Sequence, residues 1–519
     1  MGKQKLLVFK ASRIIFLLAI AAISSLPILS ASGDYAPTSS VHGTLSKTSM
    51  FVKVYANIVN NVQGSLTPQD VQATSDGGYI LSATSTTSSG VLISWLVKLG
   101  SLGNPQWQVE AGCLTQGEYS VGISVHQTAD GGYILGGGTV GCGSGADCPS
   151  SSGIQCAWVG RLDSGGILVW EHAYSAGSAG SGITQIRPTS DGGYIAAGSA
   201  TTANYYTGAL ILKLDSQGGV QWQRLFGPAG STNAYFNSVI QTSDGGYVAV
   251  GDFATPVSGL PQPTVLAVKF DSNGSVQWQQ GYNNIDSNGA ITGASSAQSI
   301  IQTSDGGYLT VGSWRNPVNT GATPTLGALL LKLDTNGKIQ WQKAYSSGTY
   351  CFYNGYSETC SQIAPSVYSV HQTLDGGYVL AGDGPLELVD SVPIVPWLAK
   401  VDSNGNLLWQ YLYYQTYKPT GRPLSEYFAS ATLAQDGGFL AVGSTENYAN
   451  GLNELYVVKT DNAGLVKGCS EVHNATPITL VNPSLATVIP YFPVDTTITP
   501  DVPSPGKTLS TSIGTQQDC

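Results

Sequence analysis

Short runs of β-branched and aromatic residues recur along the chain from residue 51 to residue 469. One unit holds Ser-Val-Ile-Gln-Thr (238–242), Tyr-Val-Ala-Val-Gly (247–251), a run around Lys269 and a run around Trp278. These runs have strand length, and Asp-Gly or Asn-Gly dipeptides between them supply the positive φ angles that tight hairpins need. Each unit is therefore predicted to form four antiparallel strands.

The tetrapeptide Asp-Gly-Gly-Tyr marks the repeats. It begins at Asp76, Asp130, Asp191, Asp244, Asp305 and Asp375, and Asp436 opens a seventh copy with Phe439 in place of Tyr. A tryptophan follows later in the unit, at Trp107, Trp170, Trp222, Trp278, Trp341 and Trp409. Repeated four-stranded units are typical of one architecture. The sequence predicts an all-β, seven-bladed β-propeller over residues 51–469.

The seventh unit lacks a tryptophan strand, because Gly468 stands where the tryptophan is expected. At the other end of the repeats, Phe51-Val-Lys-Val-Tyr55 aligns with Trp341-Gln-Lys-Ala-Tyr345. We expect the strand from Phe51 to Tyr55 to be outermost in the blade that contains Asp436. Such a closure would remove the exposed edge of an open array.

The segments that flank the repeats differ from them in composition. Residues 1–32 have a basic start, an apolar run and a small-residue cleavage site, which is the pattern of a signal peptide. An uncleaved N-terminal anchor is the alternative, since the apolar run nearly reaches spanning length. Either way we expect a secreted or cell-surface, extracytoplasmic protein. Residues 33–50 are expected to be a linker, and the Pro- and Thr-rich residues 470–519 an extended linker or stalk.

Charge narrows the range of partners. Removing residues 1–32 takes four of the 22 Lys and Arg, which leaves 18 cations against 32 Asp and Glu and a net charge of −14. Such a surface repels phosphate backbones, so nucleic acid is not an expected partner. Membrane contact is expected only through an uncleaved anchor.

The repeat motif resembles a known group of proteins. Gln241-Thr-Ser-Asp-Gly-Gly-Tyr247 is followed by Lys269-Phe-Asp-Ser-Asn-Gly274 and Trp278. This form is similar to the QTxDGGY … KxDxxGxxW repeats of exported bacterial and archaeal cell-surface propeller proteins, and the resemblance covers residues 51–469. It implies a propeller at the cell surface but says little about activity, because fold does not imply function.

Eight cysteines in an exported chain indicate disulfides. Cys351 and Cys360 are expected to staple one loop. The others form a local group of Cys142, Cys148 and Cys156, with Cys113 as a possible fourth member, and a pair, Cys469 and Cys519, that could tie the tail to the body. Asn273 and Asn474 begin sequons for glycosylation in an exported protein.

The segments of variable length are expected on one face of the propeller, opposite the uniform hairpins, and function commonly lies on such loops. Two aromatic loops are candidate binding surfaces for a sugar or a protein, since tyrosine offers apolar area with a polar tip. Their candidate residues are Tyr350, Phe352, Tyr353 and Tyr356 in the first, and Tyr414, Tyr417 and Arg422 in the second. In the second loop the alternative is that the first aromatics only finish the tryptophan strand and pack against its neighbour.

No cofactor and no metal site is expected. His126 and His371 share the position in Ser-Val-His-Gln-Thr where other repeats place Ile186, Ile240 or Ile301, so we interpret both as substitutes for a packing residue. The repeated turn aspartates lack the alternating ligands of a calcium loop and are interpreted as turn formers. The sequence contains no nucleophile elbow and no His-Glu-x-x-His motif.

One cation recurs in the third strand of every unit and is predicted to pair with the turn aspartate of its own blade, as Lys332 with Asp305. The set is Lys98, Arg161, Lys213, Lys269, Lys332, Lys400 and Lys459. A buried ammonium without a partner is costly, so a structural role is expected. A cation ring that binds an anion is the alternative.

The leading hypothesis is an extracellular, non-catalytic propeller of a prokaryotic cell surface that binds a glycan or protein through its variable-loop face. A structural component of the cell envelope or of an assembly is the second hypothesis. The third is a propeller enzyme similar to quinoprotein dehydrogenases, from the Asp-x-x-Gly-x-x-x-Trp run alone.

Overall fold

The computed structural model describes residues 50–59, 62–86, 90–112, 119–140, 154–175, 180–201, 207–227, 233–257, 260–285, 287–288, 290–316, 325–353, 358–386, 394–414, 416–417, 422–423, 427–447, 451–467, 472–474, 479–481, 485–487, 493–494, 499–501, 509–510 and 512–517. The signal peptide and nearly all of the linker predicted before residue 51 lie outside these ranges. Within them, no helix has the length and apolar character needed to cross a membrane.

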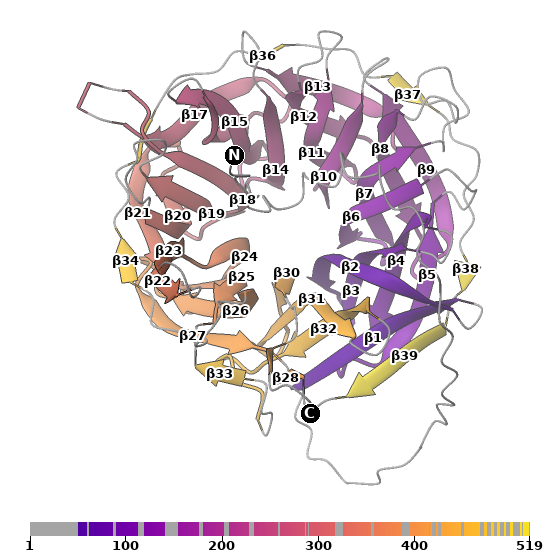
Figure 1. Cartoon of the computed structure of the whole chain (residues 1–519). Coiled ribbons are helices and arrows are strands. Elements are labelled where there is room, and N and C mark those ends of the chain that lie inside the picture. Colours follow the sequence, from indigo (N-terminus) through magenta and orange to yellow (C-terminus); the bar gives the residue numbers. More distant parts are fainter. Residues whose placement is uncertain are drawn as a thin grey trace, which may run out of the picture. The chain divides into compact units, whose positions relative to one another are not determined.

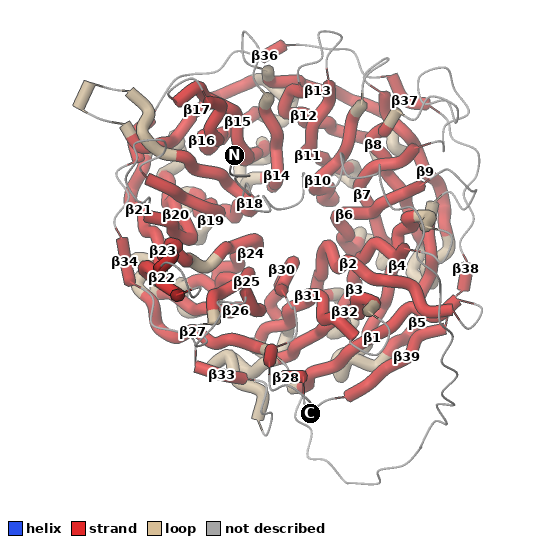
Figure 2. The backbone as a smooth tube through the Cα atoms, in the orientation of Figure 1, coloured by secondary structure: helices blue, strands red, loops and turns tan. Residues whose placement is uncertain are grey.

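Seven four-stranded antiparallel sheets surround one axis as the blades of a propeller (Figure 1). All of the regular structure drawn is strand (Figure 2). Blade 1 contains β2 (Val62–Ala73), β3 (Tyr79–Thr86), β4 (Leu92–Leu99) and β5 (Pro105–Ala111). Blade 2 contains β6 (Tyr119–Gln127), β7 (Tyr133–Val140), β8 (Gln155–Leu162) and β9 (Leu168–Ser175). Blade 3 contains β10 (Ser181–Pro188), β11 (Tyr194–Thr201), β12 (Thr207–Leu214) and β13 (Val220–Phe226).

The remaining blades follow the same order, with the first strand of each nearest the axis (Figure 1). Blade 4 contains β14 (Ala234–Gln241), β15 (Tyr247–Val257), β16 (Leu260–Phe270) and β17 (Val276–Asn284). Blade 5 contains β18 (Ala294–Gln302), β19 (Tyr308–Asn316), β20 (Thr325–Leu333) and β21 (Ile339–Ser346). Blade 6 contains β24 (Ser366–Gln372), β25 (Tyr378–Pro385), β26 (Ile394–Val401) and β27 (Leu407–Tyr413). Blade 7 contains β30 (Tyr427–Leu433), β31 (Phe439–Asn447), β32 (Leu452–Lys459) and β1 (Phe51–Val59).

Two small hairpins lie between blades. One joins β22 (Gly348–Tyr353) to β23 (Glu358–Ile363), and the other joins β28 (Thr416–Tyr417) to β29 (Arg422–Pro423).

The repeated Asp-Gly-Gly motif forms the hairpin between the first two strands of a blade. In blade 4, the N–H of Gly245 donates to the carbonyl of Thr242 at 2.9 Å, and Gly245 adopts a φ of 80°. The carboxylate of Asp244 accepts hydrogen bonds from the N–H of Gly246 at 3.0 Å and from the hydroxyl of Thr242. The aspartate therefore holds the turn, while glycine supplies the left-handed conformation.

The hydrophobic core lies between blades. Val248 and Val250 of blade 4, for example, share one buried cluster with Leu329 and Leu331 of blade 5. Because each sheet buries both faces against its neighbours, its inner strands are almost continuously apolar, as β20 is.

The repeated tryptophan packs against the next blade. The ring of Trp278 lies under Gly337 of blade 5, where a Cβ would come within 3.0 Å of it. The indole Nε1 donates to the carbonyl of Thr335 at 3.0 Å, and the hydroxyl of Tyr282 donates to the carbonyl of Gly337 at 2.5 Å. Glycine is therefore needed at 337 both for its φ of 78° and for the close approach of the ring.

The strand Phe51 to Tyr55 occupies the corresponding place in blade 7. Strand β1 pairs antiparallel with β32, in a register that joins Phe51 to Lys459 and Tyr55 to Leu455. Phe51 lies under Gly103 of blade 1 as the tryptophans lie under their glycines. The end of β1 turns directly into β2 of blade 1, so this strand is shared by the first and last blades.

The short strands described after Cys469, in a segment that we expected to form an extended linker or stalk, lie on the outer rim of the ring (Figure 1). They add one strand to the outer edge of every blade. The pairs are β33 (Val472–Asn474) with β27, β34 (Thr479–Val481) with β21, β35 (Leu485–Thr487) with β17, β36 (Pro493–Val494) with β13, β37 (Thr499–Asp501) with β9, β38 (Leu509–Ser510) with β5 and β39 (Ser512–Gln517) with β1. The tail thus visits the blades in the order 6, 5, 4, 3, 2, 1 and 7.

Candidate functional site

The third-strand cation of each blade contacts the turn aspartate of the same blade. The pairs are Lys98 with Asp76, Arg161 with Asp130, Lys213 with Asp191, Lys269 with Asp244, Lys332 with Asp305, Lys400 with Asp375 and Lys459 with Asp436. In blade 5 the Lys332 ammonium, only 3% exposed, lies 2.9 Å from Asp305 and also donates to the carbonyl of Leu333. Because each cation is bonded at the hairpin end of its own blade, the geometry favours the structural role over a cation ring.

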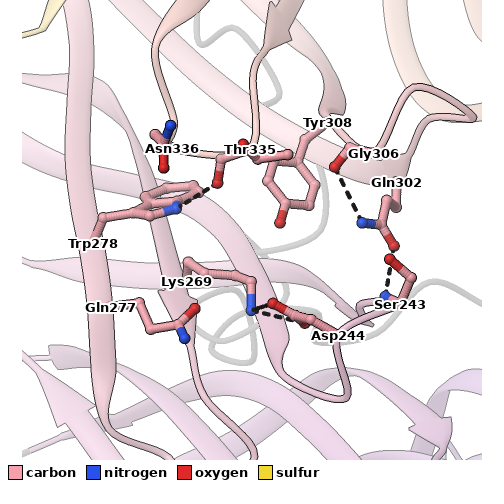
Figure 3. A pocket seen from close by; sticks show the side chains of 10 residues that line it. All are labelled: Ser243, Asp244, Lys269, Gln277, Trp278, Gln302, Gly306, Tyr308, Thr335 and Asn336. Atoms are coloured by element: carbon pink, nitrogen blue, oxygen red, sulfur yellow. Dashed lines mark hydrogen bonds and ion pairs between the residues drawn. The ribbon is translucent and has the colours of Figure 1, made fainter.

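A pocket of about 570 Å³ lies between blades 4 and 5 (Figure 3). Trp278 and Tyr308 form its aromatic part, with ring centroids 6.0 Å apart. Most of its polar groups bond to one another: Lys269 to Asp244, and the Gln302 amide oxygen to the N–H of Ser243 at 2.8 Å. Equivalent bonds recur at other blade junctions, such as Ser190 to Gln241. We therefore interpret this pocket as part of the contact that holds blades 4 and 5 together.

The repeat is broken at one position of the innermost strands, four residues before the turn aspartate. The side chains there are Gln72, His126, Arg187, Ile240, Ile301, His371 and Thr432. They occupy one register level, since His126 pairs with Ile134, Arg187 with Ile195 and His371 with Val379. Our alignment of His126 with Ile186 is therefore wrong: Ile186 belongs to the preceding position and packs in the core between blades. Counting back from Asp191 would have found Arg187.

Three of these side chains come together across the ring. His126 and Arg187 lie on neighbouring strands β6 and β10, and His371 lies on β24 (Figure 1). Two blades separate blade 6 from blades 2 and 3 in either direction, so His371 faces the other two across the axis. The electrostatic coupling of His126 to both Arg187 and His371 agrees with this convergence. We call His126, Arg187 and His371 the axial cluster.

Two atoms of the axial cluster are buried without a hydrogen-bond partner among the described residues. They are Nε2 of His126, whose residue is only 8% exposed, and Nε of Arg187. His371 is anchored instead, because its Nε2 bonds to the carbonyl of Ala431 at 2.7 Å and must donate there. An unsatisfied buried polar group costs about 1–3 kcal/mol, so a ligand that bonded to these two atoms would stabilise the cluster.

One carboxylate lies beside the axial cluster. Asp70 lies on β2, two residues before Gln72. Its carboxylate accepts hydrogen bonds from the Ser430 hydroxyl at 3.0 Å, the Ser124 hydroxyl at 3.3 Å and the Val125 N–H at 3.2 Å. These bonds tie blades 7, 1 and 2 together at the inner rim. Asp70 also favours the charged form of Arg187 electrostatically. The carboxylate oxygens of Asp70 thus accept hydrogen bonds that join neighbouring blades.

Both imidazoles of the axial cluster are neutral at pH 7. Burial, together with the charges of Arg187 and His371, holds the pKa of His126 well below its usual range. Burial and Arg187 lower the pKa of His371 to about 4, although its bond to Ala431 opposes the shift. Burial also lowers the pKa of Arg187. A cationic guanidinium flanked by two neutral imidazoles offers several donors and at least one acceptor to a polar ligand.

Two further features concern possible metal ligands and the histidine of an outer strand. No group of three His, Cys, Asp or Glu side chains within the described ranges is arranged to hold a metal ion. His172 stacks on Trp170 at 5.1 Å and bonds to the carbonyl of Gln217, in the outer strand of blade 2.

The candidate binding loops are only partly described. Tyr350, Phe352 and Tyr353 lie on β22, and Tyr417 and Arg422 face each other in register across β28 and β29. Tyr356 lies outside the described residues. Tyr414 is half-buried against the core between blades 5 and 6, as the alternative interpretation of this segment expected.

The cysteines and the two glycosylation positions are also only partly described. Cys351 and Cys360 are directly opposite in the register of β22 and β23, and the disulfide between them stays a prediction. Cys156 is disulfide-bonded. Cys113, Cys142, Cys148, Cys469 and Cys519 lie outside the described residues. Asn273 is in an exposed turn, and Asn474 ends the short strand β33.

Comparison with known proteins identifies no family for this chain. No family model matches the chain, and no curated protein matches it. A solved structure of a protein of unknown function from Bacteroides caccae is 13% identical, with a TM-score of 0.33, and the match covers 61% of this chain and 89% of that one. A polysaccharide lyase of family PL25, an ulvan lyase, is 10% identical with a TM-score of 0.40, covering 80% of this chain and 96% of that one. The strand topology itself shows that the protein is an all-β, seven-bladed propeller.

Proposed function

We propose that this chain is a non-catalytic binding propeller that acts outside the cytoplasm, at a prokaryotic cell surface, and captures a glycan at the axial cluster. The observation that carries the proposal is the break in the repeat. Ile240 and Ile301 stand in blades 4 and 5 where His126, Arg187 and His371 stand in blades 2, 3 and 6. An apolar side chain is therefore compatible with the scaffold at this position, and the polar replacements add unsatisfied groups to it.

Departures from a locally consistent pattern concentrate at functional sites, because a scaffold gains nothing from them. The neutral imidazole of His126 offers one donor and one acceptor, and a guanidinium offers five donors. His371 keeps only its Nδ1 as an acceptor, because its Nε2 donates to Ala431. This set matches sugar hydroxyls, which donate and accept. The variable-loop face, where the sequence placed the ligand, lies largely outside the described residues, so the proposal moves the binding site to the axis.

The test replaces the axial histidines with the isoleucine that blades 4 and 5 carry. The variants are His126→Ile and His371→Ile, and His172→Gln changes a histidine of the outer rim as the matched control. Binding of the full chain to an immobilised glycan panel is measured beside the free energy of unfolding. We expect the axial variants to lose binding at least tenfold and the control to keep it, with little change in stability. Equal binding by all three variants would overturn the proposal, and recovery of a shortened glycan would contradict its non-catalytic part.

A further inference from the structure

We propose that the axial cluster is an anion-binding site that takes a single carboxylate or sulfate group of an acidic sugar, held by the guanidinium of Arg187 between the imidazoles of His126 and His371. This inference rests on the proposed function and names the chemical class of the ligand. It follows from the position, charge and bonding of the three side chains.

The first step is geometric. All three side chains stand at one register level of the innermost strands, and blades 2 and 3 face blade 6 across the axis. A ligand group bound between them would therefore be contacted by side chains from opposite sides of the axis. Propellers with repeated strands place residues from different blades around such an axis without any change in the backbone.

The second step is the charge of the cluster. Arg187 is half-buried, and its Nε has no hydrogen-bond partner among the described residues. Asp70 is the carboxylate coupled to it, and the neutral donors Ser124, Ser430 and the N–H of Val125 leave the charge of Asp70 in place. Asp70 thus supplies part of the counter-charge that a buried cation needs, and the unpaired Nε is the group of Arg187 left for a ligand. An oxyanion is the group that a guanidinium binds best, because two parallel N–H···O bonds match its planar fork.

The third step concerns the imidazoles. Burial first, and then Arg187, lowers the pKa of both His126 and His371, so these rings stay neutral. The Nε2 of His126 is buried and unpaired, and it can donate to an anion as a neutral tautomer or after protonation. Anion binding would offset the repulsion and raise the pKa of each ring. Protons are then taken up as the anion binds, which gives the site a measurable signature.

Size and overall charge limit the ligand. The chain without its predicted signal peptide carries a net charge of −14, which repels a polyanion at long range. A sugar with one acidic group avoids most of this repulsion while still meeting the local charge of Arg187. We therefore expect an isolated uronate or sulfate group rather than a highly charged polymer.

The experiment follows the histidines by NMR in the full chain labelled with ¹³C-histidine, which has only five histidines to resolve. Sodium sulfate, sodium glucuronate and neutral glucose are added in turn at constant ionic strength. We expect sulfate or glucuronate to shift the His126 and His371 signals to saturation and to raise both pKa values, with glucose giving no such rise. The anion that binds more tightly distinguishes a sulfate ester from a uronate.

Three variants sharpen the test. Arg187→Gln should weaken anion binding at least tenfold and, without anion, raise the pKa of both axial histidines. Arg187→Lys keeps the charge but loses the fork, so it should bind more weakly than the native chain. Arg224→Gln, on the outer strand of the same blade, is the matched control and should change neither quantity.

Each possible result supports or contradicts a stated claim. If sulfate and glucuronate leave the axial signals of the native chain unchanged, the anion inference is wrong even if Arg187→Gln fails to fold. If neutral glycans bind at the axis as tightly as acidic ones, the inference fails and the proposed glycan function stands. If anions titrate the cluster but no glycan on the panel binds, the anion site stands and the glycan function fails.

Discussion

The hydroxyl of Tyr55 donates a hydrogen bond to the carbonyl of Gly103 at 2.5 Å, across the junction between blades 7 and 1. Tyr174 makes the same bond to Gly218 at 2.7 Å between blades 2 and 3. The first strand after residue 50 thus repeats, at the closure of the ring, a contact used inside it. Lys53 adds to the junction through Leu102, whose carbonyl accepts from its ammonium at 2.8 Å.

Tyr55→Phe should lower the free energy of unfolding by about 1–2 kcal/mol, because it leaves a buried carbonyl without its donor. Tyr174→Phe is the matched change inside the ring and should cost a similar amount. Both are measured by denaturant unfolding of the full chain. A Tyr55→Phe variant as stable as the native chain, beside a destabilised Tyr174→Phe, would indicate that the junction contributes nothing to the ring.

Asp305→Asn should destabilise blade 5 by about 1–3 kcal/mol, because it leaves the buried ammonium of Lys332 without its counter-charge. The substitution keeps the oxygen that accepts from the N–H of Gly307, so the hairpin itself is retained. Lys332→Met removes the charge as well as the pair and should cost less. Denaturant unfolding of both single variants checks the order, and the reverse order would contradict a structural ion pair.

Two sets of carboxylates make the stability depend on pH in opposite directions. The turn carboxylates Asp76, Asp191, Asp244, Asp305 and Asp375 have pKa values lowered to about 2 by bonds to their lysine and turn partners, against burial. Their stabilisation is complete above the unfolded pKa near 4 and is lost as the pH falls towards 2. Burial instead raises the pKa of Asp252 to about 6 and of Asp383 to about 7. The stability linked to these two is present below pH 4 and is lost as the pH rises through 6 to 7.

Melting temperature should therefore rise from pH 2 to about pH 4. Above pH 4 the loss from Asp252 and Asp383 is opposed by His126 and His371, because their lowered pKa values add stability as the pH rises towards 6.5. Asp383→Asn keeps an oxygen beside Tyr368, whose hydroxyl bonds to Asp383 at 2.7 Å, and removes the ionisation. Relative to the native chain, this variant should gain stability as the pH rises from about 4 to 7 and leave the acid limb unchanged. A difference between the two profiles that stays constant from pH 4 to pH 7 would refute the assignment.

Deletion of residues 471–519 should expose the outer edge of every blade, since each described tail strand pairs with an outermost strand. Unpaired strand edges promote association between chains. We expect the shortened chain to self-associate in light scattering and to be less stable to heat. A peptide of residues 471–519 added in trans should reverse both effects, and a shortened chain that stays monomeric with an unchanged melting temperature would contradict this role.

Much of the fold could be predicted because local chemistry repeats. The Asp-Gly-Gly hairpin at Asp244 uses only neighbouring residues, so its motif identifies the turn wherever it occurs. The same holds for the third-strand cation, since Lys332 and Asp305 lie at the same end of adjacent strands. The axial cluster was missed, because Arg187 was aligned one position out of register and His126 and His371 were interpreted as packing residues.

The sequence by itself determined the strands, their turns and the number of blades, because each depends on residues within one repeat. Only the tertiary structure decided which exceptions to the repeat meet. His126 and His371 are 245 positions apart in the numbering, and they converge with Arg187 because a closed ring of seven blades brings blade 6 opposite blades 2 and 3. The path of the tail around the rim was likewise not predictable, since its strands pair through backbone groups that carry no sequence pattern.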